Sequence, residues 1–148
     1  MKVQKSHGRD MWCAAFLLAF VLASAGRAAA EDSSPVVTPL LSTGTSVLGE
    51  PLHYPTSGPA HVTATIVTLA PGARTALHKH GVPMFAYVLE GEITVDYGDR
   101  GKRIYHQGEA IVEAMDVAHF GADVAALPVR LLVVYMGAEG AADVVPVQ

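Results

Sequence analysis

Turn signals recur at short intervals along this chain, and they constrain its fold more than any other feature. Pro71-Gly72, Glu90-Gly91, residues 98–101 and Gln107-Gly108 separate short segments rich in Val, Ile, Thr, Tyr and Phe. Such residues favour strands, whereas Gly and Pro mark the turns between them. After residue 30, no stretch combines a helical period with helix caps. The sequence therefore predicts an all-β fold, an antiparallel sandwich or barrel.

The strand-like segments suggest how the domain is organised. Residues 61–70 alternate in the manner of a strand, and the segments on either side of the tetrapeptide at 98–101 form a hairpin pattern. The longer apolar run at 128–137 suits a buried core strand. We expect an N-terminal arm with short edge strands at 31–60, the barrel core at 61–137, and a C-terminal tail at 138–148.

The first thirty residues have the features of a secretory signal peptide. Basic residues precede an apolar segment at 11–26, and Ala28, Ala29 and Ala30 are small residues suited to cleavage. The apolar segment is short for a membrane span, which needs about 20 residues. The sequence therefore predicts a protein exported to the periplasm or secreted, with no membrane span after cleavage.

Removal of the signal changes what the composition implies. The only cysteine, Cys13, leaves with it, so the mature chain has no disulfide. Its six basic and thirteen acidic residues give a net charge of −7 with neutral His. Nucleic acid is therefore not an expected partner, because phosphate binding needs clustered Lys and Arg. The one basic cluster, residues 99–103, is interpreted as a solvated hairpin tip.

Two histidines at a spacing of two, His78 and His80, are the main candidates for chemistry. Residues i and i+2 of a strand face the same side, so both imidazoles could bind one cation. A third ligand must come from a neighbouring strand, and His119, after a turn at Asp116, is the best candidate. A pair of exposed edge-strand histidines would have the same spacing, so the pattern alone leaves both interpretations open. The remaining histidines of the mature chain, His53, His61 and His106, are expected at the surface or in hydrogen bonds, and His53 could also cover a cavity mouth.

Together these residues resemble the cupin superfamily. Its first motif, G-x5-H-x-H-x3-4-E-x6-G, is filled at every spacing by Gly72, His78, His80, Met84 and Gly91, with Met84 in place of Glu. In its second motif, G-x5-P-x-G-x2-H-x3-N, Gly108 and His119 match. Three positions of the second motif depart from it: Ala114, Asp116 and Asp123.

The resemblance implies a small jelly-roll β-barrel with a metal site in its interior. His78, His80 and His119 would bind one divalent transition metal (Fe, Mn, Ni, Cu or Zn). It also implies a small-molecule substrate and a dioxygenase, lyase or isomerase type of reaction. Because no carboxylate offsets the ion's charge, the ligand is expected to be anionic and chelating. The alternatives are a non-catalytic metal or small-ligand binding protein of the cell envelope, and a structural cupin without metal.

Met84 takes the position of the missing acid and is expected to point inward. Three interpretations remain open: a wall beside a three-His site, a thioether ligand that favours copper, or a core side chain in an empty barrel. Alternation from Met84 places Ala86 and Val88 inside. Glu113, the nearest acid, is expected to face solvent, and Met115 and Phe120 are candidates for the cavity entrance. Family resemblance also suggests a homodimer paired through edge strands, with residues 36–41 as the candidate edge.

Overall fold

The computed structural model describes residues 34–148, so the predicted signal peptide lies outside the described residues. The chain divides into the units Met1–Val36 and Val37–Gln148, and the strands described below lie in the second. No helix in the described part is both long and apolar enough to cross a membrane. Its single helical element is the 3-10 turn η1 (Gly98–Arg100), and the other regular elements are strands. The predicted all-β class is confirmed.

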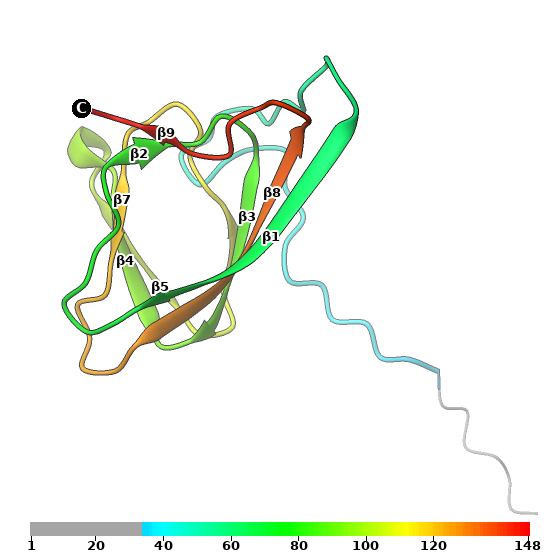
Figure 1. Cartoon of the computed structure of the whole chain (residues 1–148). Coiled ribbons are helices and arrows are strands. Elements are labelled where there is room, and N and C mark those ends of the chain that lie inside the picture. The colour runs from blue at the N-terminus through cyan, green and yellow to red at the C-terminus, as the bar shows by residue number, and fades with distance from the viewer. Residues whose placement is uncertain (1–33) are drawn as a thin grey trace, which may run out of the picture. The chain divides into compact units, whose positions relative to one another are not determined.

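Antiparallel pairing joins the strands into three sheets (Figure 1). The four-stranded sheet has the order β1-β8-β3-β6, the three-stranded sheet β5-β4-β7, and the small sheet β2-β9. Figure 1 shows β3, β8 and β1 on one side of the barrel and β4 and β7 on the other. The bounds are β1 Ala60–Leu69, β2 His78–Lys79, β3 Met84–Glu90, β4 Glu92–Asp96, β5 Lys102–His106, β6 Ala110–Val112, β7 Phe120–Ala122, β8 Val129–Ala138 and β9 Val145–Pro146.

Alternation along the central strands builds the core between the sheets. In β3 and β8 every second side chain is buried over most of the strand, as the period of two requires. Ala86 and Val88 are 4% and 2% exposed, so the expected inward face of β3 is confirmed. The core cluster comprises Met84, Ala86, Val88, Ile93, Val95, Tyr97, Tyr105, Ala114, Val129, Leu131 and Val133.

The turns lie where the sequence indicates them. β4 and β5 form the predicted hairpin around η1, and Lys102 pairs with Asp96 at 3.0 Å. Gly91 joins β3 to β4 with φ +75°, and a Cβ at this position would lie 2.9 Å from the carbonyl oxygen of Pro128. A side chain would therefore both strain the turn and push away the start of β8.

Two of the expected segments differ from the structure. Residues 34–59 form one isolated bridge, Thr45 with Pro51, and none of the expected edge strands. The Pro and Gly residues of this part interrupt regular pairing. Residues 36–41 are exposed and form no strand, so pairing of two copies through them remains only a prediction.

The C-terminal segment, which was expected to be a tail, pairs with another strand of the domain. β8 extends to Ala138, and β9 pairs with β2 through His78–Pro146 and Lys79–Val145. The backbone N–H of Val147 also donates to the carbonyl of Leu77 at 3.1 Å. We call residues 139–148 the C-terminal strap, because they run alongside the strand that carries His78.

Candidate metal centre

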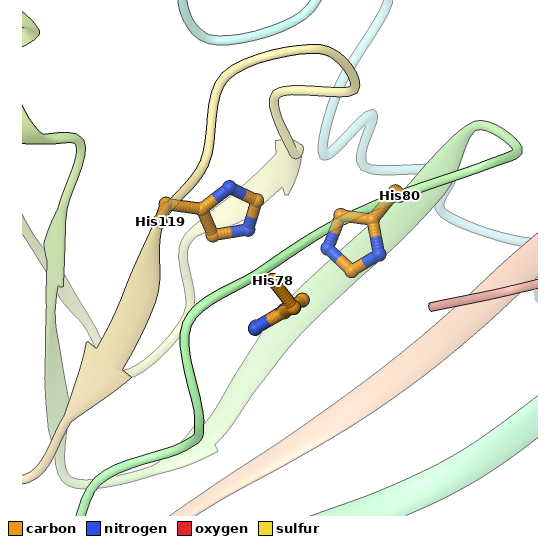
Figure 2. Close-up of side chains that lie close together, drawn as sticks. All are labelled: His78, His80 and His119. Atoms are coloured by element: carbon orange, nitrogen blue, oxygen red, sulfur yellow. The ribbon is translucent and has the colours of Figure 1, made fainter. Parts of the chain in front are cut away.

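The chain folds so that the three predicted ligands meet. His78 in β2 and His119 directly before β7 are cross-strand partners, and each backbone N–H donates to the other's carbonyl, at 3.0 and 2.9 Å. His80 lies two residues after His78 and turns its ring to the same side. Ring centroids are 4.9 Å apart for His78–His80, 4.7 Å for His78–His119 and 5.1 Å for His80–His119. Figure 2 shows the three rings converging.

Every ring is oriented by a hydrogen bond from its Nδ1. His78 Nδ1 donates to the carbonyl of Ala76 at 2.8 Å, and His119 Nδ1 to that of Val117 at 2.8 Å. His80 Nδ1 donates to the carbonyl of Asp143, in the C-terminal strap, at 3.2 Å. A carbonyl only accepts, so each Nδ1 carries the proton and each Nε2 has a free lone pair. This is the arrangement that orients metal-binding histidines in proteins.

The donor set fits a divalent transition metal. One nitrogen from each of the three rings lies within 4.8 Å of the other two. His80 Nε2 is buried and has no hydrogen-bond partner among the described residues. Such an orphaned nitrogen is costly unless something binds it. The three histidines could therefore hold one metal ion, and three protein ligands leave coordination positions open.

Burial keeps His80 and His78 free of protons. It lowers the pKa of His80 to about 4, and the neighbouring His119 and His78 lower it further, while the hydrogen bond to Asp143 opposes the shift. Burial also lowers the pKa of His78. Neutral imidazole is the form that binds metal, so the site is prepared for an ion at neutral pH.

A cavity of about 80 Å³ lies against the three rings. Its wall is mostly aliphatic, with Met84 among the lining residues, as expected for the position of the missing acid. Met84 is 8% exposed. Its role as wall or ligand stays a prediction. The other lining residues include Val67, Thr75, Ala86, Val88, Ile93, Val95, Ile111, Glu113, Gly121, Leu131, Val133 and Tyr135.

The prediction that Glu113 faces solvent is wrong. Its side chain is 3% exposed and lines the cavity. Strict alternation fails here, because Val112, Glu113 and Ala114 are all buried where the chain leaves β6. The available signal was an acid enclosed in the apolar run at 110–114.

Of the other predictions near the site, those for the remaining histidines agree with the structure and those for the cavity entrance do not. His53, His61 and His106 are exposed, as predicted. Met115 and Phe120 are not among the residues that line the cavity. Phe120 instead packs under Arg74, whose guanidinium carbon lies 5.3 Å from the ring centroid.

Sequence reasoning also missed Glu50, which supports the turn before His119. Its carboxylate accepts hydrogen bonds from the Ser46 hydroxyl at 2.6 Å and from the backbone N–H groups of Met115 and Asp116, both at 3.0 Å. Burial raises the pKa of Glu50, but these three bonds and the electrostatic effect of His119 together lower it more. Glu50 therefore anchors the 43–52 loop to the turn that delivers His119.

A substitution at Gly81 tests whether the strap positions His80. A Cβ at Gly81 would lie 2.3 Å from the carbonyl oxygen of Ala142, so Gly81→Ala must push the strap away and weaken the bond from His80 Nδ1 to Asp143. Loss of such an orienting bond typically lowers metal affinity about 10–100-fold, and we expect a zinc affinity lowered by about tenfold or more in isothermal titration. Gly44→Ala, with open space around its Cβ, is the matched control. Equal zinc affinities for the two variants would exclude a positioning role.

Comparison with known proteins agrees with this geometry. The family model described as "Cupin domain" matches residues 65–135. No curated protein sequence matches the chain. Among solved structures, the polyketide cyclase RemF from Streptomyces resistomycificus is 26% identical with a TM-score of 0.51, and the match covers 59% of this chain and 61% of the cyclase. Oxalate decarboxylase from Lactobacillus farciminis is 19% identical with a TM-score of 0.50, over 58% of this chain and 26% of the decarboxylase, and shows the fold alone.

The chain thus spans less than two thirds of the length of either of these structures. The matched region contains the three histidines, the inward strand β3 and most of β8. The motif spacing, the barrel and the converging rings all lead to the same assignment. Residues 65–135 of the chain therefore form a cupin domain.

Proposed function

We propose that this protein binds one divalent transition metal through Nε2 of His78, His80 and His119, and that a small molecule binds beside the ion in the barrel cavity. The observation that carries the proposal is the set of three Nδ1–H bonds to backbone carbonyls, at 2.8, 3.2 and 2.8 Å. They leave one unprotonated nitrogen on each ring, and one nitrogen of each ring lies within 4.8 Å of the other two. A packing role would not need them, since it would be served better by apolar side chains.

The three nitrogen donors also indicate which class of ligand would bind beside the metal. Among the described residues, the cluster with metal-binding geometry contains three neutral histidines and no carboxylate. A divalent ion there would have no carboxylate among its protein ligands, which favours an anionic ligand in the open positions. When bound, such an ion supplies Lewis-acid polarisation of the ligand. The mostly aliphatic wall suits a small organic molecule.

The reaction is proposed as a dioxygenase, lyase or isomerase type of conversion of that molecule. The likeness to a polyketide cyclase at 26% identity supports chemistry on a small organic molecule within this barrel. The mostly aliphatic cavity favours the second candidate, a carrier that binds the same metal and ligand without turnover. Export of the protein is part of the proposal and rests on the predicted signal peptide alone.

Metal analysis tests the proposal. We expect about one ion per chain after separate loading with zinc, manganese, iron(II), nickel and copper. In the cobalt(II) form, the chelating anion malonate is expected to change the visible absorption spectrum, because it enters the open positions. If no metal binds under any loading condition, the proposed function is wrong. Met84→Leu is expected to leave affinity and metal preference unchanged, whereas a selective loss of copper(I) binding would make the thioether a ligand.

A further inference from the structure

Glu113 has a hydrogen-bonding pattern that leaves one of its oxygens free. The Tyr97 hydroxyl donates to Oε1 at 2.7 Å, and the backbone N–H of Ala114 donates to the same Oε1 at 2.8 Å. The second oxygen, Oε2, accepts no hydrogen bond from the described residues. Because Glu113 is 97% buried and lines the cavity, Oε2 is an unused acceptor at the cavity wall.

Two buried phenols fix the orientation of this carboxylate. Tyr97 has one hydroxyl proton and gives it to Glu113, so its oxygen accepts from the Tyr105 hydroxyl at 3.1 Å. Burial raises the pKa of Tyr97, with a further rise from the charge of Glu113, and burial likewise raises the pKa of Tyr105. Both phenols therefore remain protonated donors. Tyr97 and Tyr105 are 1% and 8% exposed, so packing holds the chain of hydrogen bonds in place.

The cavity thus has two polar regions of opposite character. The three-His cluster is one, and Glu113 is outside that cluster. Aliphatic side chains of Val88, Val95 and Leu131 are part of the wall that both regions share. A carboxylate repels a second anion in a cavity of low polarity, so an anionic group of a ligand belongs beside the histidines and a donor group belongs beside Glu113.

We propose that Glu113 is a ligand-recognition residue, whose Oε2 accepts a hydrogen bond from a hydroxyl group of a small hydroxy acid with its carboxylate at the three-His centre. This inference rests on the proposed function and adds the class of ligand to it. The hydroxyl satisfies the unused acceptor, and the aliphatic wall encloses the short carbon chain between the two ends. A keto acid of the same length lacks the donor and would leave Oε2 without a partner.

Glu113→Gln tests this inference directly, because two neighbouring donors fix which way the new amide group is oriented. The Tyr97 hydroxyl and the Ala114 N–H both need an acceptor at the position of Oε1, so the amide oxygen must occupy it. The amide NH2 then occupies the position of Oε2. The variant therefore presents a donor to the ligand where the wild type presents an acceptor, and its preference should change from hydroxyl to keto.

The experiment measures binding of 4-hydroxypentanoate and 4-oxopentanoate by isothermal titration to the zinc-loaded protein, with 3-hydroxybutyrate and 3-oxobutyrate as a shorter pair. We expect the wild type to bind the hydroxy acid of at least one pair about tenfold more tightly, and Glu113→Gln to prefer its keto partner. Zinc stoichiometry should be the same in both proteins. Glu109→Gln, an exposed acid near the same strand, should behave as the wild type.

Two results would overturn the inference: a wild type that binds both members of each pair equally, or a Glu113→Gln variant that keeps the wild-type preference. Failure of the proposed function gives a different result, namely no zinc binding by the wild type. In that case the neutral pair 2-pentanol and 2-pentanone is titrated into the zinc-free protein. A preference for the alcohol that Glu113→Gln reverses would support the recognition role, and its absence would exclude that role.

Discussion

Replacing His80 by leucine is expected to lower zinc affinity by about 100-fold or more, while the metal-free protein stays at least as stable as the wild type at neutral pH. The loss should exceed the 10–100-fold effect typical of an orienting residue, because a ligand itself is removed. The metal-free variant should keep its stability because it lacks His80 Nε2, which is buried without a hydrogen-bond partner among the described residues. An unsatisfied buried nitrogen costs about 1–3 kcal/mol, against about 0.5–1.5 kcal/mol for the lost bond to Asp143.

The two readouts together separate a metal ligand from a structural histidine. Zinc affinity is measured by competition with a chromogenic chelator, and stability by urea unfolding followed by circular dichroism in the presence of EDTA. His106→Leu is the control, since the side chain of His106 is exposed and its Nδ1 lies 3.2 Å from the carboxylate of Glu92. A His80→Leu protein that is much less stable without metal and still binds zinc tightly would assign His80 to packing instead.

Local spacing explains how much of this site was predictable. The pair at His78 and His80 follows from a period of two. The inward position of Met84 came from the resemblance to the first cupin motif, and alternation from Met84 then gave the inner face at Ala86 and Val88. His119 required one further step, a partner strand, which the motif supplied. These features depend on short stretches of backbone, so they can be predicted from the local sequence.

What could not be predicted depends on contacts between distant residues. The Asp143 carbonyl that orients His80 lies 63 residues further along the chain, and Glu50 reaches the His119 turn across 65 and 66 residues. The sequence of the strap, residues 139–148, does not reveal that it contacts the site. Its contribution is one backbone carbonyl and the two residues of β9, and neither depends on a recognisable side chain. Glu113 was misplaced for a related reason: its carboxylate accepts a hydrogen bond from Tyr97, which follows β4 and lies 16 residues earlier.

The metal-free protein is expected to lose about 3 kcal/mol of stability through His80 alone between pH 7 and pH 4. The pKa of His80 is lowered from 6.5 to about 4 in the folded state, mainly by burial. Below pH 6.5 the unfolded chain therefore takes up a proton that the folded chain does not, and the unfolded state gains in stability. The contribution is complete above pH 6.5, is lost as pH falls, and ends near pH 4, where the folded state is protonated as well.

Urea unfolding at pH 7 and pH 4 in the presence of EDTA measures this loss, and His80→Leu isolates it. Acidic groups such as Glu50, whose pKa is lowered, also weaken the fold in acid, but they do so in both proteins. The difference between the wild type and the variant should therefore change by about 3 kcal/mol across this interval. His78, whose pKa is lowered in the same direction, remains in both proteins. An identical pH dependence for the two proteins would mean that His80 is not a neutral, desolvated imidazole, and the preparation of the site for metal would then need another explanation.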